Sequence, residues 1–221
     1  MSTALLESPA RVRAGVAAPT PASSPRPRRL SATEYLALDE AAERRSELIE
    51  GEMFPMAGAS RTHSRIATNL SYELESQLLD EEWDLFSSET RVGAGIGYYY
   101  PDLGIVGGEY LVDPLNRNTL TNPVVLVEIL SPSTMHVDHG VKLRDYLRLP
   151  SLRTYLIVSQ NTPFVQQYER GSDTGTWQFT AHDGLGEMVE LPAIGCHLPL
   201  SAIYRRVVFT ETEADSDESA N

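Results

Sequence analysis

The sequence lacks the features of a secreted or membrane protein. Its 221 residues include one cysteine, Cys196, so no disulfide can form within the chain, and a reducing compartment is the natural setting. No apolar run reaches the roughly eighteen residues that a membrane-spanning helix needs. The N-terminus shows no apolar segment typical of a secretory signal. We therefore expect a cytoplasmic protein without a membrane partner.

Basic residues are also scarce, with 18 Lys and Arg against 31 Asp and Glu, for a net charge of −13. The first 30 residues carry five arginines and one acid, whereas residues 209–221 carry five acids and no base, which leaves −12 for the segment between them. That segment does not have the basic stripe of a sequence-independent DNA binder. The acidic core therefore counts against a nuclease, unless its acids cluster at a metal site or on a face that does not meet the substrate.

Both ends of the chain are predicted to lie outside the folded domain. Residues 1–30 are rich in Pro, Ala, Ser and Arg without periodicity, which predicts a disordered basic tail, with a transit peptide as the alternative. Residues 209–221 are predicted to form a disordered acidic tail. A hydrophobic content of 41% can bury a core, so we expect one domain over residues 31–208.

Between the tails, helices and strands follow in mixed order. Ser31 and Ser60 each stand where a side chain can cap a following helix. In the second helix four apolar residues fall four apart and share one face: Ile66, Leu70, Leu74 and Leu78. The other predicted elements are a hairpin over Ser46–Met56 that turns at Glu50-Gly51, a helix over Asp138–Leu149, and strands at Trp83–Ser87, Tyr98–Val106, Val124–Leu130, Thr154–Ser159, Phe164–Glu169 and Trp177–Thr180. This order predicts an α/β (α+β) fold with a mixed central sheet flanked by helices.

The most informative segment is the apolar run Val124–Leu130, which only Glu128 interrupts. A continuous apolar run is typical of a central strand that is covered on both faces. A glutamate there is costly unless it is paired, hydrogen-bonded or bound to a metal. One interpretation is a buried salt bridge to Lys142 or Arg144. We favour the other, an active-site carboxylate, because perturbed buried acids cluster at functional sites.

Asp102 follows Pro101 and precedes another apolar strand. The Pro-Asp pair alone is a common turn, but together with Glu128 it can bring two carboxylates to one point, and Mg²⁺ prefers such oxygen ligands. Lys142 lies on the helix after Glu128 and can aim its ammonium at the same point. Its alternatives are a solvated surface lysine or a partner for Asp138, four residues earlier.

Several segments taken together resemble one family. They are Glu50-Gly51-Glu52, His63 on the next helix, Pro101-Asp102, the run Val127-Glu128-Ile129-Leu130-Ser131-Pro132-Ser133-Thr134, and Asp138, Lys142 and Tyr146. From about Ser31 to about Tyr204 the chain resembles the Uma-two family of restriction-endonuclease-like proteins. The resemblance implies a PD-(D/E)XK fold, a Mg²⁺ or Mn²⁺ cofactor, and hydrolysis of phosphodiester bonds in nucleic acid, with DNA as the expected partner. A homodimer is the assembly we consider.

The resemblance also implies roles for individual residues. Asp102 matches the PD aspartate and Glu128 the acid of the (D/E)XK element. Leu130 stands where the lysine of that element is expected, and Lys142 matches the lysine that this family carries on the next helix. In this scheme the two acids hold the metal, and Lys142 orients the attacking water or stabilises the growing negative charge.

Two further residues match the family pattern. Glu50 matches an early acidic residue and is expected as a third metal ligand beside Asp102 and Glu128. His63 matches the family's helix histidine and is expected to contact phosphate or transfer a proton, although a histidine satisfied by its neighbours is the alternative.

Other chemistry finds less support in the sequence. His136 and His139 can suggest zinc, but no third ligand is evident. The glycine-rich stretch 93–97 lacks the strand-to-helix context of a dinucleotide site and is predicted to be a loop. The adjacent Cys196 and His197 do not form a nucleophile–base pair. The alternative to a nuclease is an inactive protein of the same fold that binds nucleic acid or protein.

Overall fold

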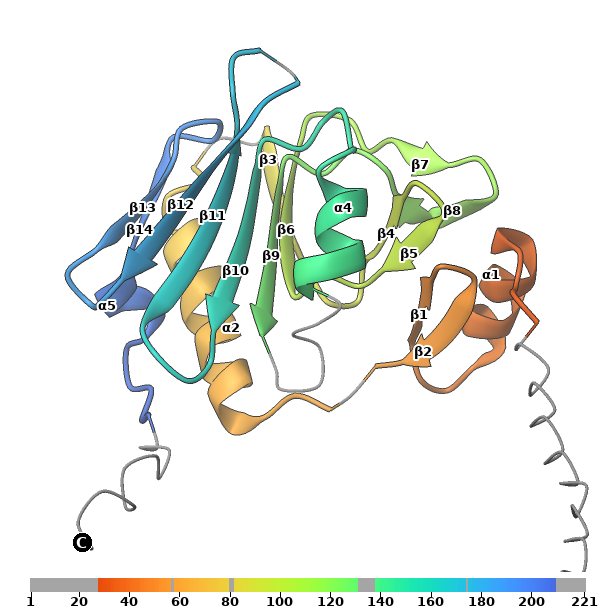
Figure 1. The fold of residues 1–221 in the computed structure, drawn as a ribbon, viewed down its shortest axis with the longest axis horizontal. Coiled ribbons are helices and arrows are strands. Elements are labelled where there is room, and N and C mark those ends of the chain that lie inside the picture. The colour runs from red at the N-terminus through yellow and green to blue at the C-terminus, as the bar shows by residue number, and fades with distance from the viewer. Residues whose placement is uncertain (1–27, 57, 80–81, 131–137, 174, 210–221) are drawn as a thin grey trace, which may run out of the picture.

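The computed structural model in Figure 1 describes residues 28–56, 58–79, 82–130, 138–173 and 175–209. Its helical elements are α1 (Ala32–Ala41), α2 (Arg61–Glu75), the π-helical turn η1 (Asp138–Lys142), α4 (Leu143–Tyr146) and α5 (Leu200–Ile203). None of the helices in these ranges is long and apolar enough to cross a membrane.

The central sheet has six strands in the order β12-β11-β10-β9-β6-β3. Their bounds are β3 (Trp83–Ser87), β6 (Leu103–Gly107), β9 (Val125–Leu130), β10 (Thr154–Ser159), β11 (Phe164–Arg170) and β12 (Trp177–Asp183). Only the pair β9–β10 is parallel, so the sheet is mixed. Helix α2 lies on one face, and α4 lies on the other (Figure 1).

A second six-stranded sheet, in the order β2-β1-β5-β4-β8-β7, lies beside the first, and α1 packs on it (Figure 1). Its strands are β1 (Ser46–Ile49), β2 (Glu52–Pro55), β4 (Arg91–Ala94), β5 (Gly97–Tyr99), β7 (Val112–Asp113) and β8 (Asn116–Leu120). A hairpin of β13 (Met188–Leu191) and β14 (Cys196–Pro199) packs against the α2 side of the central sheet.

Two apolar layers hold the central sheet between its helices. The alternating side chains of each strand divide between the two faces, as a pleated strand requires. One layer joins α2 to the sheet through residues that include Ile66, Leu70, Leu74, Val125 and Val127. The other layer lies under α4 and is rich in tyrosine; it includes Tyr99, Leu126, Tyr146, Tyr155 and Ile157. The strand β9 is therefore covered on both faces, as its continuous apolar run predicts.

Most of the predicted elements are confirmed. Ser31 caps α1 through a capping box with Glu34, and Ser60 caps α2 by accepting a hydrogen bond from the backbone of His63. The Ser46–Met56 hairpin turns at Glu50-Gly51, where both residues have positive φ. The mixed sheet with flanking helices is the fold that the order of elements predicted.

Several local predictions are wrong. The helix predicted over Asp138–Leu149 begins as the π-helical turn η1, and its α-helical part ends at Tyr146. Helix α2 ends at Glu75, so Leu78 lies beyond it.

The segment 98–106 is not one strand: β5 belongs to the second sheet and β6 to the central sheet. Pro101 has no N–H for a sheet ladder, and the N–H of Tyr100 bonds the side chain of Glu47, so the chain passes from one sheet to the other here. The stretch 93–97 is not simply a loop either. It is the tip of the β4–β5 hairpin, where Gly95 adopts a φ of +63°.

The packed domain extends slightly beyond residues 31–208. Leu30 packs against the cluster under α1, and its N–H donates to the carbonyl of Gly51 over 2.8 Å. At the other end Phe209 packs on Tyr204, with ring centroids 5.5 Å apart. The predicted disorder of the tails concerns residues 1–27 and 210–221, which lie outside the described residues.

Candidate active site

Glu128 is buried near the end of β9, on the face covered by α4. It is 4% exposed, and its Oε1 lies 3.2 Å from Lys142 Nζ and accepts a hydrogen bond from the hydroxyl of Tyr146 over 3.0 Å. Lys142 is also only 4% exposed, so it is not a solvated surface lysine. Of the two cations predicted as partners for Glu128, Lys142 contacts it, whereas Arg144 bonds Glu50 and Asp145.

A third acid, Glu47, completes this cluster, and the sequence analysis missed it. Its Oε1 lies 2.9 Å from Lys142 Nζ and accepts the backbone N–H of Tyr100 over 3.0 Å. Glu47 comes from β1 in the second sheet, so Lys142 joins the two sheets. The sequence signal was weak, one acid beside Leu48 and Ile49 in the predicted hairpin, and only the structure shows that every residue of Ser46–Ile49 is buried.

Asp102 occupies the turn that leads into β6. One oxygen, Oδ2, accepts the backbone N–H of Ile129 over 2.7 Å, and the other, Oδ1, lies 3.0 Å from Nε2 of His63. The second imidazole nitrogen of His63, Nδ1, is buried and has no hydrogen-bond partner within the described part of the chain. A buried polar atom without a partner is unusual in a native structure, and such atoms often mark functional sites.

Strand register brings Asp102 and Glu128 to the same end of the sheet. Leu103 on β6 pairs with Val127 on the antiparallel strand β9. Asp102, which precedes Leu103, and Glu128, which follows Val127, are therefore neighbours at the end of this strand pair. The bond from Ile129 N–H to Asp102 ties the two segments together at that point. The register therefore places the two segments side by side at this end of the sheet. That their two carboxylates hold one metal ion stays a prediction.

Glu50 lies apart from this group. It stands in the β1–β2 turn with φ +50°, its side chain is about half exposed, and Oε1 pairs with Arg144 over 3.1 Å. Arg144 also bonds Asp145, which accepts the hydroxyl of Tyr99 over 2.7 Å. Glu50 is therefore linked to Tyr99 only indirectly, through Arg144 and Asp145. The acid of the β1–β2 hairpin that contacts Lys142 is Glu47.

Among the described residues no three His, Cys, Asp or Glu side chains form a ready-made metal cage. The zinc alternative cannot be placed, because His136 and the side chain of His139 lie outside the described residues, as does the side chain of Asp138. Cys196 is buried and His197 is exposed, consistent with two neighbours that do not act as a pair.

Tyrosines surround the cluster as neutral hydroxyl donors. Burial, followed by the charge of Glu128, raises the pKa of Tyr146 well above its usual value, so its hydroxyl keeps the proton that it donates to Glu128. Burial and the hydrogen bond to Asp145 likewise raise the pKa of Tyr99. Both raised pKa values favour the protonated hydroxyls, which donate to Glu128 and Asp145.

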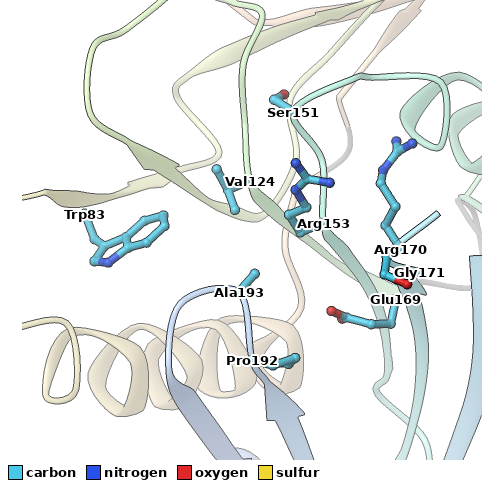
Figure 2. Close-up of a pocket in the computed structure, with 10 residues that line it drawn as sticks. Trp83, Val124, Ser151, Arg153, Glu169, Arg170, Gly171, Pro192 and Ala193 are labelled. Atoms are coloured by element: carbon cyan, nitrogen blue, oxygen red, sulfur yellow. The ribbon is translucent and has the colours of Figure 1, made fainter. Parts of the chain in front are cut away.

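A pocket of about 550 Å³ lies at the opposite end of the central strands (Figure 2). Val124, just before β9, lines it, whereas Glu128 lies near the other end of that strand. Trp83, Arg153, Glu169 and Arg170 form much of the remaining wall (Figure 2). None of the predicted site residues reaches this pocket.

Comparison with known proteins agrees with this architecture. Two uncharacterized proteins of Synechocystis sp. are similar in sequence. One, sll1609, is 34% identical over 164 residues, which cover 73% of this chain and 91% of the relative. The other, slr1290, is 31% identical over 192 residues, which cover 85% and 97%.

The crystal structure of a "putative nuclease belonging to DUF820" from Anabaena variabilis has the same fold, with a TM-score of 0.64 at 19% identity. The match covers 79% of this chain and 97% of that one. The Uma2 family, described as "Putative restriction endonuclease", matches residues 32–201. The match spans nearly the whole described domain, including both sheets and every residue of the site. The chain therefore belongs to the Uma2 family.

Proposed function

We propose that this protein is a metal-dependent endonuclease that hydrolyses phosphodiester bonds of nucleic acid, with DNA as its substrate. The observation that carries the proposal is the buried carboxylate of Glu128, which pairs with Lys142. It lies at the same end of the paired strands β6 and β9 as Asp102. Membership of a family described as "Putative restriction endonuclease" supports the same chemistry.

The donor set fits a divalent metal. Glu47 and Glu128 share the ammonium of Lys142, so among the described residues two carboxylates meet one cation in this cluster. Magnesium is usually held by one or two protein carboxylates and completes its shell with water and substrate phosphate. Asp102 and Glu128 would hold Mg²⁺ or Mn²⁺, and the bound metal would supply positive charge at the phosphate and a more acidic water.

Lys142 has a role of its own in this proposal. Leu130 occupies the position where a PD-(D/E)XK strand would carry its lysine, and Lys142 reaches Glu128 from η1 instead. A buried ammonium stabilises negative charge more strongly than a solvated one, because the surrounding dielectric is low. Two carboxylates and the Tyr99 ring, 5.9 Å away, hold the ammonium in place.

Asp102 and His63 form the other half of the site. The N–H of Ile129 fixes the Asp102 carboxylate, and His63 reaches it from the first turn of α2. His63 can therefore orient Asp102 or exchange a proton with groups that enter the site. Glu50 stays a proposed ligand that would have to leave Arg144 to reach the metal.

One observation favours the alternative, a non-catalytic module of the same fold. Lys142 is fully engaged by two buried acids, an arrangement that also serves to join two sheets. In that case the cluster stabilises the domain, and the protein acts by binding nucleic acid or another protein.

Cleavage of supercoiled plasmid DNA with Mg²⁺ or Mn²⁺ tests the proposal. Wild type is expected to nick the plasmid, Glu128→Gln to lose that activity, and the control Arg117→Gln, at an exposed arginine on β8 of the other sheet, to retain it. DNA binding without cleavage at any metal concentration would favour the non-catalytic module.

A further inference from the structure

A row of aromatic side chains runs across β10, β11 and β12, from Tyr155, which packs against Tyr146 of α4, to the exposed Phe179. Tyr155 stacks on Tyr168 with centroids 6.2 Å apart and an interplanar angle of 26°, and Tyr168 contacts Phe179 at 5.2 Å. These residues are cross-strand partners on β10, β11 and β12. The exposed fraction of the side chain rises along the row, from 0% for Tyr155 to 54% for Phe179.

The row lies on the same sheet face as Glu128. Tyr155 pairs with Leu126 and Ile157 pairs with Glu128 in the parallel β9–β10 register. Residues two apart on a strand share a face, so Leu126 and Glu128 point to the same side. Tyr168 then stands two strands across and two residues along from Glu128, about 10 Å by about 7 Å away on standard sheet spacings.

The outer end of the row carries positive charge. The guanidinium of Arg170 lies 4.4 Å from the ring centre of Trp177, its cross-strand partner, and bonds the carbonyls of Leu147, Leu149 and Leu152 just after α4. Arg148 lies within this bonded segment. It is exposed, and no ion pair or side-chain hydrogen bond joins it to any residue that the structure describes.

This face also differs from the acidic remainder of the chain. The side chains that β11 and β12 place on it include one acid and one base, and the others are neutral: Phe164, Gln166, Tyr168, Arg170, Trp177, Phe179, Ala181 and Asp183. In a chain of net charge −13, a nearly neutral aromatic face with a free arginine beside it is a surface that phosphates can approach.

We propose that this aromatic row, Tyr168, Phe179 and Trp177 with Arg148 beside it, is a stacking platform for unpaired bases of a single-stranded nucleic acid. The proposal rests on the proposed nuclease function and names its substrate class: a strand, or the frayed end of a duplex, whose unpaired bases lie on the platform while a phosphate about two nucleotides away reaches Glu128. Exposed aromatic rings bind unpaired bases, because the base faces inside a duplex are already stacked on each other.

The test is binding of a fluorescein-labelled oligothymidine and of a blunt duplex by the full-length protein, measured by anisotropy in EDTA so that cleavage cannot intervene. We expect the single strand to bind more tightly. Phe179→Ala should weaken it about tenfold, the loss of one stacked base, and Phe179→Trp should retain binding. Arg148→Gln should weaken binding and reduce the salt slope by about 0.7, the loss of one phosphate contact.

The matched control is Phe54→Ala, since Phe54 is 43% exposed on β2 of the other sheet. It should bind like wild type. The proposal is overturned if Phe179→Ala binds as well as wild type, if Phe54→Ala is equally impaired, or if wild type prefers the duplex or binds neither probe.

The proposed nuclease function fails separately. Single-strand binding that depends on Phe179, without cleavage in Mg²⁺ or Mn²⁺, would reject the endonuclease and keep the platform. Cleavage that Phe179→Ala leaves unchanged would support the endonuclease and reject the platform. If Phe179→Ala instead turns a dimer into a monomer in light scattering and leaves oligothymidine binding unchanged, the face is a self-association surface and the platform is rejected.

Discussion

Two buried charged clusters among the residues that the structure describes are built on different principles. In the first, Asp39 and Arg91 are 0% and 3% exposed and lie 2.7 Å apart. Asp39 also accepts the N–H of Ser46 and the hydroxyl of Tyr100, and Arg91 donates to Thr119. One negative and one positive charge meet, and Ser46, Tyr100 and Thr119 supply the remaining hydrogen bonds.

In the second cluster Glu47 and Glu128 share Lys142. Asp102 lies at the same end of the strand pair β6–β9, and its side chain contacts His63. Among the described residues, the contacts of this cluster therefore bring two acids to one ammonium.

The difference separates a structural ion pair from a candidate site. A balanced buried pair in which both carboxylate oxygens are hydrogen-bonded has no need of a ligand and is costly to disturb. A cluster with surplus carboxylates is stable only at some cost, because like charges repel, and a cation that binds the folded state removes that cost. Four predictions test this contrast, in decreasing order of expected effect.

Breaking the balanced pair should have the largest effect. Arg91→Met leaves Asp39 buried without its cation, and we expect a loss of about 3–5 kcal/mol in the free energy of unfolding. Urea denaturation measures it, and Mg²⁺ or Mn²⁺ should not restore the loss. A variant within about 1 kcal/mol of wild type would mean that the Asp39 cluster is not structural.

Lys142→Met should also destabilise the domain, by about 3 kcal/mol, because two buried carboxylates lose their shared ammonium. Unlike the Arg91 variant, it should regain part of its stability in Mn²⁺, since a divalent ion can replace the lost charge. Arg148→Met, an exposed arginine nearby, is the control and should melt like wild type. A variant of Lys142 that stays as stable as wild type would show that its contacts with the two acids contribute little.

The metal response itself should follow the site and not the structural pair. Mg²⁺ or Mn²⁺ at about 100 times the dissociation constant should stabilise wild type by about 2.7 kcal/mol, which is several degrees in Tm. Glu128→Gln and Asp102→Asn should lose most of this rise. Asp39→Asn should melt at a lower temperature yet keep the rise, and its loss there would show that the metal binds elsewhere.

The smallest effect separates the two acids of the β1–β2 hairpin. Glu50→Gln removes an exposed ion pair with Arg144, so its cost should stay below about 1 kcal/mol, whereas Glu47→Gln removes a buried contact of Lys142. If Glu47 belongs to the site, its variant should change the Mn²⁺ response of the Tm more than the Glu50 variant does. The opposite order would support Glu50 as the ligand that the family resemblance implied.

Sequence by itself determined the parts of this protein that follow from local pattern. The apolar run Val124–Leu130 predicted the central strand β9 and singled out Glu128, because a charge inside such a run must find compensation. Ser31 and Ser60 predicted two helix starts, since their side chains cap the backbone within three residues. These inferences need only neighbours along the chain.

Tertiary structure alone decided the partners. Glu47 meets Lys142 across 95 positions of sequence, and Arg91 meets Asp39 across 52, so no periodicity connects either pair. The passage from β5 to β6 through Tyr100 and Pro101 likewise depends on which sheet each segment joins. A hydrogen bond or ion pair requires its two groups to lie within a few ångströms of each other, but it sets no limit on their separation in the sequence. Only the folded arrangement of the sheets brings these groups that close.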